Sequence, residues 1–415
     1  MSSAADMEMR VDPPHSANPA TTGIAVCLGT WCADATVEQL TPILKLLQAA
    51  LGSRTASVIV AYPATNPQAD AWQHEGFSMQ PYAFDGNKPS LNTTTAASYR
   101  NMQDVMQTYK TSCGILLGAE AQTLHPDALR GMVDAVLDRN ADVALPRYSV
   151  GSNEALINAA LLYPLSRAIF GVKACFPFAL DQVLSVRAAE RMAVAAGQAA
   201  KASGGDAFVW PTAEAAAAGF IVAEITAGTR IFPIQPNTDL SLVLNLLGSS
   251  LFSEIEAKAS FWQRTRPLQA MLSLDVVPAQ HVTTEPVSSD EVAEMIESFR
   301  IAHGNLQEIW SLVLPPQTLL GLKRLSRMPN ESFSMPDALW VRILYDFVLA
   351  YRLRTINRGH LLGTLTPLYL AWVASHILAA QTTDATNPPE SLARAFEADK
   401  PYLVSRWRWP DRFNP

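Results

Sequence analysis

Short apolar runs alternate with predicted helices along the first part of the chain. The runs, each followed by polar or turn-forming residues, cover residues 23–28, 56–62, 114–117 and 142–145. Residues 36–51 and 93–110 are predicted to be helices, and a further helix is expected after Pro126. Strands that alternate with helices predict a mostly parallel sheet, covered by helices on both faces.

The pattern changes after about residue 250, where the strand-like runs end. Ser288 and Glu291 have the spacing of a capping box, which predicts that a helix begins there. Residues 334–336 open a second predicted helix, whose apolar side chains form one stripe at helical spacing. Residues 361–380 add a third helix. We therefore expect the C-terminal third to be all-helical.

These patterns divide the chain into four predicted parts. Residues 1–22 carry prolines and acidic residues without an apolar run, so they are expected to be a disordered tail rather than a signal peptide or membrane anchor. An α/β domain follows at 23–250. Residues 251–286, which contain several prolines, are predicted to be a linker, and residues 287–415 an all-helical C-terminal domain.

One apolar stretch is long enough to cross a bilayer, because no Asp, Glu, Lys or Arg occurs between Arg358 and Asp384. Thr364, Pro367 and His376 interrupt this stretch. A buried helix is therefore favoured over a transmembrane span.

Composition narrows the class of protein. Hydrophobic residues make up 49% of the chain and charged residues 17%, which is typical of a globular protein. The formal net charge of −7 argues against a nucleic-acid-binding protein, whose binding surface should be basic. The cysteines have no Cys-x-x-Cys spacing, so neither a disulfide scaffold nor a structural zinc site is expected; they are Cys27, Cys32, Cys113 and Cys175. A reduced, cytoplasmic location fits best.

Standard catalytic motifs do not occur: the chain has no P-loop, no Gly-x-Gly-x-x-Gly and no Gly-x-Ser-x-Gly. In a parallel sheet the ligand crevice lies at the carboxyl ends of the strands. Glu120 follows the predicted strand at 114–117, where a carboxylate is suited to a divalent cation that carries a phosphate. The alternative, that Glu120 faces water or caps the next helix, is favoured by spacing alone.

Three segments then carry a resemblance to a known family. They are residues 161–185 (LLYPLSRAIFGVKACFPFALDQVLS), residues 207–220 (AFVWPTAEAAAAGF), and Tyr345-Asp346-Phe347 with residues 365–369. In this order they resemble the GT-A fold glycosyltransferases, specifically the retaining mannosylglycerate synthase and glucosyl-3-phosphoglycerate synthase group. The resemblance spans roughly residues 23–380 and implies a GT-A type nucleotide-sugar-binding domain followed by a helical part.

The same resemblance implies a donor site whose motifs have drifted. Gly118-Ala119-Glu120 stands where the family has Asp-x-Asp, so Glu120 is expected to neutralise the leaving diphosphate or to hold a metal. Of the family's Gly-Gly-Asp, only Asp181 remains, and it is expected to act near the anomeric carbon. Lys88 is displaced by one position from the Lys of the family's Gly-Lys-Gly loop, whereas Asn92 matches the Asn after that loop; both are expected to bind the donor. The family's metal-binding His falls near Phe232.

Further candidates surround these positions. Trp31, at the end of the first strand, is either a platform for the nucleotide base or part of the core. Arg147, Tyr148 and Asn153 lie where the family has its acceptor loop; Arg147 either clamps a carboxylate or phosphate or pairs with Glu154.

The C-terminal tail at 406–409 interleaves Arg with Trp. It is expected to dock on the protein body by its tryptophans rather than to rest on a membrane.

The sequence thus predicts a transferase that moves a sugar from a nucleotide-sugar to a small acceptor, which could bear a carboxylate. The alternative is a catalytically inactive pseudo-glycosyltransferase that binds a ligand or partner. No cofactor is expected, because Gly118 and Phe232 replace likely ligands of Mg²⁺ or Mn²⁺ and Glu120 alone offers too few oxygens. The expected partners are the nucleotide-sugar and the acceptor, without nucleic acid or a transmembrane span; a homo-oligomer stays open.

Overall fold

The structure is a computed structural model, and the part of the chain that it describes comprises residues 23–29, 37–52, 54, 58–64, 72–74, 76–83, 94–203, 207–232, 239–264, 268–280, 282, 286–381 and 390–410. The tail at 1–22, which the sequence predicts to be disordered, lies outside these residues.

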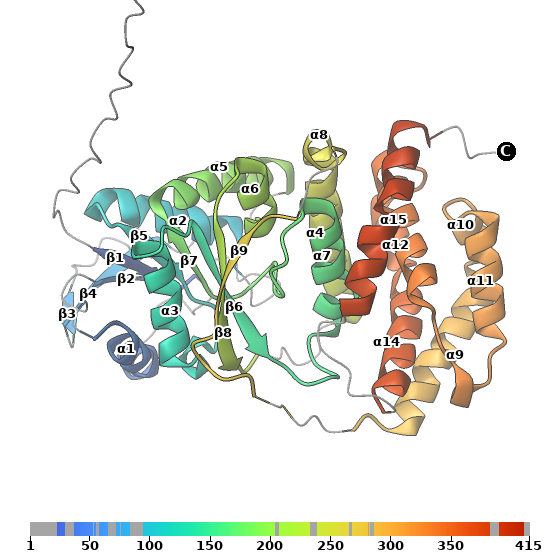
Figure 1. The fold of residues 1–415 in the computed structure, drawn as a ribbon, viewed down its shortest axis with the longest axis horizontal. Coiled ribbons are helices and arrows are strands. Elements are labelled where there is room, and N and C mark those ends of the chain that lie inside the picture. The colour runs from blue at the N-terminus through green and yellow to red at the C-terminus, as the bar shows by residue number, and fades with distance from the viewer. Residues whose placement is uncertain are drawn as a thin grey trace, which may run out of the picture.

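Within the described residues, nine strands form one sheet in the order β3-β4-β2-β1-β5-β7-β6-β8-β9 (Figure 1). The strands are β1 (Ile24–Cys27), β2 (Val58–Ala64), β3 (Trp72–His74), β4 (Phe77–Ala83), β5 (Cys113–Leu116), β6 (Val143–Ser149), β7 (Gln182–Ser185), β8 (Val222–Thr229) and β9 (Met271–Leu274). Neighbouring strands are parallel except at β3, which runs against β4, and at β7, which runs against both β5 and β6. The expected mostly parallel α/β sheet is therefore confirmed.

The central strands are short and apolar because both of their faces are covered. Val26 of β1 lies in register with Val60 of β2 and Ile115 of β5, and all three side chains are buried. Such a strand shows a continuous apolar run rather than alternation. This is why the sequence predicts β1, β2 and β5 to within two residues.

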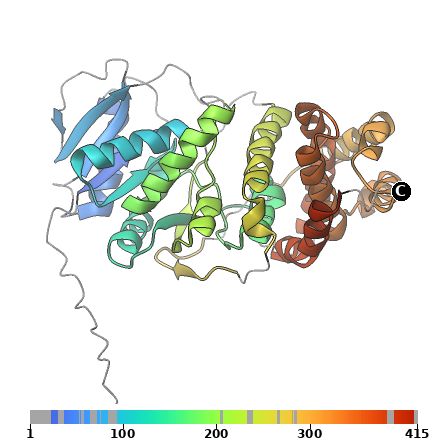
Figure 2. The same cartoon turned by 90° about the horizontal axis from the view of Figure 1, so that it is seen from above.

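Helices cover the two faces of the sheet. One face carries α3, which contacts β5 to β8, with α1 beside it; the other carries α2 and α5, and α6 packs beside α5. Figure 2 shows α2 and α5 running across this second face. The elements that accompany the sheet are α1 (Val37–Leu51), α2 (Ala96–Tyr109), η2 (Ala121–Thr123), α3 (Pro126–Leu137), η3 (Asn158–Leu162), α4 (Tyr163–Phe170), α5 (Val186–Ser203) and α6 (Pro211–Ala218).

Helices alone form the C-terminal third of the described chain, as predicted (Figure 1). Ser288 and Glu291 make the expected capping box, and α9 begins directly after it. The elements after β8, apart from β9, are α7 (Leu240–Ala257), α8 (Ala259–Trp262), α9 (Ser289–Asn305), α10 (Gln307–Ser311), α11 (Pro316–Ser326), η4 (Asn330–Ser332), α12 (Asp337–Leu353), α13 (Arg358–Gly363), α14 (Thr366–Ala380) and α15 (Glu390–Arg408).

The segment at 251–286, predicted to be a linker, differs from that expectation in its described part. It contains the second half of α7, the short α8, and β9, which pairs in parallel with β8 from Val222 opposite Met271. The four residues of β9 lie at the sheet edge and are partly exposed. So short an edge strand leaves little apolar pattern in the sequence.

Two helical stretches of the described chain are apolar and long enough to cross a membrane, Leu240–Ala257 and Arg358–Ala380. In the second, 67% of the most apolar window is buried inside the protein. That burial is typical of a core helix, as the sequence predicts for this stretch. The stretch is also divided into α13 and α14, with Pro367 in the first turn of α14.

Candidate functional site

The carboxyl end of β5 meets the start of β7 at one buried ion pair. Asp181 comes directly before β7 and Arg230 directly after β8, and the side chains of both are fully buried. The Arg230 Nε donates to Asp181 Oδ2 at 2.8 Å, and the backbone N–H of Gly118 donates to Asp181 Oδ1 at 3.0 Å. One carboxylate therefore joins the loops that follow β5 and β8.

Arg230 also holds the loop after β5 directly. Its Nη2 donates to the carbonyl oxygen of Ala119 at 2.7 Å, and its Nη1 donates to the carbonyl oxygen of Ile231. Burial works to lower the pKa of the guanidinium, but the Asp181 carboxylate outweighs it and raises that pKa. Arg230 is thus a fixed positive charge at this edge of the sheet.

Tyr148 completes the buried cluster. Its hydroxyl donates to Asp181 Oδ2 at 2.8 Å, and its ring packs edge-on against Phe176 and Phe232. Burial, and then the Asp181 charge, raise the pKa of Tyr148 well above its ordinary value. Tyr148 thus remains a neutral hydrogen-bond donor in this cluster.

Glu120 lies in the same loop, two residues after Gly118. Its backbone adopts the left-handed conformation with φ 62°, uncommon for a residue other than glycine. Its side chain accepts a hydrogen bond from Gln122 at 2.7 Å, and its carbonyl oxygen accepts one from the Thr123 hydroxyl at 2.7 Å. The side chain is half-buried and contributes to the negative potential around Arg230.

The predicted acceptor residues do not all lie together. Arg147 pairs with Asp275 at 2.9 Å and approaches Glu224 at 3.8 Å, rather than pairing with Glu154. Alternation along β6 places Arg147 on the opposite sheet face from Tyr148. In the described part of the chain, the buried Oδ1 of Asn153 has no hydrogen-bond partner.

The remaining predicted donor residues, Trp31, Lys88 and Asn92, lie outside the described residues. Among the described residues, no group of three or more His, Cys, Asp or Glu side chains is arranged to hold a metal ion. The Asp181 carboxylate already accepts hydrogen bonds from Arg230 and Tyr148, so it is not an open ligand position. Burial also raises the pKa values of the Cys27 and Cys113 thiols to about 12, so neither is a ready nucleophile.

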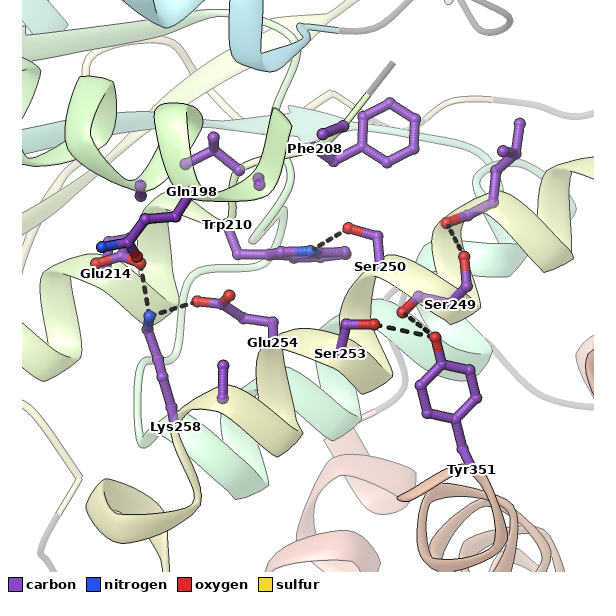
Figure 3. Close-up of a pocket in the computed structure, with 16 residues that line it drawn as sticks. Gln198, Phe208, Trp210, Glu214, Ser249, Ser250, Ser253, Glu254, Lys258 and Tyr351 are labelled. Atoms are coloured by element: carbon purple, nitrogen blue, oxygen red, sulfur yellow. Dashed lines mark hydrogen bonds and ion pairs between the residues drawn. The ribbon is translucent and has the colours of Figure 1, made fainter. Parts of the chain in front are cut away.

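A pocket of about 410 Å³ lies where the sheet layer meets the helical part (Figure 3). Its walls come from the end of α5, the segment at 207–210, α6, α7 and α12. Hydroxyl groups line the α7 side, where Ser250 accepts a hydrogen bond from the Trp210 indole at 2.9 Å and Ser253 lies 3.0 Å from the Tyr351 hydroxyl. We call this the junction pocket.

The charges of the junction pocket are balanced. Lys258 bridges Glu214 at 2.5 Å and Glu254 at 2.7 Å (Figure 3). Arg191, outside the pocket lining, pairs with Glu214 at 2.7 Å. Burial raises the pKa of Glu254 despite the neighbouring Lys258. Hydroxyls and paired charges can exchange hydrogen bonds with a neutral, polyhydroxylated molecule.

Phe178, in the segment that leads to Asp181, packs against the wall of the junction pocket. Phe178 packs against Phe208 and Trp210 of the pocket wall, with ring centroids 5.3 and 4.9 Å away. Phe178 lies three residues before Asp181 in the chain. The segment that leads to Asp181 therefore packs against residues that line the junction pocket.

Sequence reasoning missed Arg230 and the junction pocket. Arg230 stands in Arg-Ile-Phe directly after an apolar strand run, and a single basic residue at a strand end is a weak signal without its partner. The pocket residues come from five separated segments, so no local pattern marks them.

The class that fold and site define is an α/β protein with a mostly parallel sheet, a buried ion pair at the carboxyl edge of that sheet and a polar pocket between the sheet layer and the helices. No family model matches the chain, and no curated protein matches it either.

Proposed function

We propose that the chain is a GT-A type glycosyltransferase that handles a nucleotide-sugar donor without a bound divalent cation. The observation that carries the proposal is the hydrogen bond from the Gly118 N–H to Asp181. It joins the two positions that resemble the family's Asp-x-Asp and Gly-Gly-Asp motifs. The mostly parallel sheet supports the same proposal, because ligands of such sheets bind outside the carboxyl ends of the strands, where Gly118 and Asp181 meet.

Loss of the sugar from a nucleotide diphosphate creates negative charge that the protein must stabilise. In this proposal Arg230 acts indirectly: its donors are bound to Asp181, Ala119 and Ile231, so it fixes the loop after β5 and offsets the charge of Asp181. Lys88 is assigned to the diphosphate itself, and Glu120 to the donor sugar. The reaction would then take place on soluble substrates in the cytoplasm.

We assign the acceptor to the junction pocket. Arg147 is paired with Asp275 and approaches Glu224, so it is not a free clamp for a carboxylate. The junction pocket instead offers serine hydroxyls and balanced charges next to the segment that leads to Asp181. A polyhydroxylated acceptor fits this chemistry better than an anionic one.

One observation favours the second candidate, a pseudo-glycosyltransferase that binds a ligand or partner. Asp181 is fully buried and both of its oxygens accept hydrogen bonds, so no oxygen is left for a sugar hydroxyl in the described arrangement. In this alternative the cluster only fixes the geometry of the loops that it joins.

Calorimetric titration of UDP-glucose, GDP-mannose and ADP-glucose, in EDTA and then in excess Mn²⁺, tests the proposal. We expect one donor to bind with an affinity that changes by less than about tenfold with Mn²⁺, or about 1.4 kcal/mol. A larger gain would contradict the metal-free site.

Product analysis then tests activity with the same donor and a panel of sugars and polyols. We expect transfer, reduced in Glu120→Gln and unchanged in the control Glu308→Gln, an exposed residue of α10. Donor binding without transfer would favour the pseudo-glycosyltransferase. If none of the three nucleotide-sugars binds, the proposed donor site is wrong.

A further inference from the structure

A second pocket, of about 670 Å³, lies on the far side of α4 from the sheet. It is formed by the end of α4, by residues 262–264 and 268 after α8, and by the last turns of α15. Pockets that hold small molecules commonly enclose about 300–1,000 Å³. We call this the α15 pocket.

Cations dominate its polar lining. Three basic side chains reach it, Arg264, Lys400 and Arg408, against one acidic side chain, Glu397. The Glu397 carboxylate already accepts hydrogen bonds from Arg167 at 2.9 and 3.1 Å. The α15 pocket is therefore positively charged, although the chain as a whole carries −7.

Among the described residues, no ion pair joins any of these three cations to a carboxylate. Lys400 donates to the carbonyl oxygen of Ile169 at 3.1 Å, which occupies one of its three N–H groups. Burial lowers the pKa of Lys400 to about 8. Arg408 donates to the backbone oxygen of Gln263 at 2.9 Å, while exposed Arg264 has no partner in the described part of the chain.

The rest of the lining is apolar and partly open to solvent. Trp409 is 61% exposed and Leu268 is 39% exposed. Trp262 forms the floor, where it packs edge-on against Trp407 with ring centroids 4.9 Å apart. The sequence predicts that the Arg-Trp-Arg-Trp tail docks by its tryptophans. Trp407 does so, whereas Trp409 is largely exposed and lines the α15 pocket.

We propose that the α15 pocket binds an anionic amphipath, a molecule with a phosphate or carboxylate head and an apolar tail. The head meets Arg264 and Lys400, and the tail lies against Leu268 and the Trp409 indole. A single molecule is favoured over a membrane surface, because Lys400 lies inside a concave pocket rather than on a flat face. This site is independent of the proposed transferase activity.

Dodecyl phosphate, used well below the concentration at which it forms micelles, is a suitable probe. We expect saturable binding in calorimetry, together with a change in tryptophan fluorescence. Inorganic phosphate, which lacks the tail, should bind more weakly. Arg264→Gln and Lys400→Gln each remove a charged contact and should weaken binding about tenfold. Trp409→Ala should weaken it through the tail, while Lys323→Gln on α11 is the matched control and should bind as the wild type does.

Three results would overturn the proposal. The first is that dodecyl phosphate shows no saturable binding. The second is that all three pocket variants bind it with the same affinity as the control. The third is that the protein binds phosphatidylglycerol vesicles but not the monomeric probe. The last result would assign the patch to a membrane surface. Because Arg264 and Trp409 are exposed, their variants should fold and keep the test decisive even where Lys400→Gln does not.

Discussion

Asp181 and Arg230 form an ion pair without contact with solvent. Both side chains are fully buried, and Tyr148 and Gly118 supply the further hydrogen bonds that such a pair needs. A buried pair adds little net stability relative to apolar residues, but removing one partner leaves an uncompensated charge. The pair therefore fixes the geometry of the loop after β5 more than it strengthens the fold.

Replacing Asp181 by Asn should destabilise the protein by about 3–5 kcal/mol, because Arg230 stays charged and buried. Urea unfolding followed by circular dichroism measures this loss. The matched control is Glu297→Gln, which breaks the exposed pair with Arg300 at 3.7 Å and should change stability by less than about 1 kcal/mol. If the two substitutions change the free energy of unfolding equally, Asp181 does not compensate a buried charge on Arg230.

Glu390 gives a pH-dependent prediction at the same scale. Hydrogen bonds from Arg167 lower the pKa of Glu390 to about 2, against an ordinary value of 4.5. A carboxyl group whose pKa is lower in the folded state stabilises the protein above its unfolded pKa, and the contribution is lost as pH falls. Wild type should thus be more stable than Glu390→Gln at pH 7, with the difference disappearing between pH 4.5 and about 2.

Chemical denaturation at a series of pH values measures that difference. The control Glu294→Gln, at an exposed position of α9, should show no such pH dependence. A Glu390→Gln difference that stays constant from pH 7 to pH 2 would show that the contact acts through packing rather than charge.

At the scale of elements, α2 packs closely on β5 because Gly114 has no side chain. A Cβ at Gly114 would lie 2.6 Å from the sulfur atoms of both Met102 and Met106. Gly197, in the middle of α5, is the opposite case, since a Cβ there would meet no atom within 4 Å.

Gly114→Ala should therefore destabilise the protein by about 1–3 kcal/mol through overpacking. Gly197→Ala should stabilise it by about 0.5–1 kcal/mol, because glycine weakens a helix interior. Thermal unfolding of both variants tests these two predictions. If Gly114→Ala is more stable than the wild type, α2 can move away from β5 to make room for the added methyl group.

Sequence periodicity predicts the elements that bury a continuous or one-sided apolar surface. The strands β1, β2 and β5, the capped α9 and the apolar α12 and α14 belong to this class. It does not predict that β7 is antiparallel to its neighbours. The direction of a strand depends on how the chain connects it to the preceding strand, and the four residues of β7 carry no pattern that encodes it. Nor does periodicity predict β9, or the π-helical turn η3, since both depend on neighbours distant in sequence.

For the site, the resemblance selected Glu120 and Asp181, which lie in loops joined by one hydrogen bond. The pairing of Asp181 with Arg230 links residues 49 positions apart, so no local pattern could reveal it. Arg147 and Asp275 are 128 positions apart, so the sequence offers only the nearby Glu154, five residues after the end of β6, as a partner for Arg147.

At the scale of the molecule, the sheet layer and the helical part share polar as well as apolar contacts. Arg167 of α4 is buried and pairs with Glu390 and Glu397 of α15. Trp340 of α12 donates to the carbonyl oxygen of Ala160 at 2.8 Å, inside the π-helical turn. A π-helical turn shifts the backbone hydrogen-bond pattern, which helps make this carbonyl available to another helix.

We therefore expect the two parts to unfold together. Differential scanning calorimetry should give one transition, with equal calorimetric and van't Hoff enthalpies. Arg167→Ala should lower the midpoint, because two carboxylates lose their shared partner. Two separate transitions in the wild-type protein would show that the parts are independent domains.

The place of β7 has a consequence for how the chain reaches this fold during synthesis. Strand β6 leaves the ribosome before β7, yet β6 has no neighbour other than β7 and β8 in the described sheet. Until residues 182–185 emerge, β5 ends the first half of the sheet with an open edge, and open edges invite pairing with other chains. The four residues of β7 thus cover the open edge of β5 and join the two halves of the sheet, and until they emerge the nascent chain is prone to aggregate.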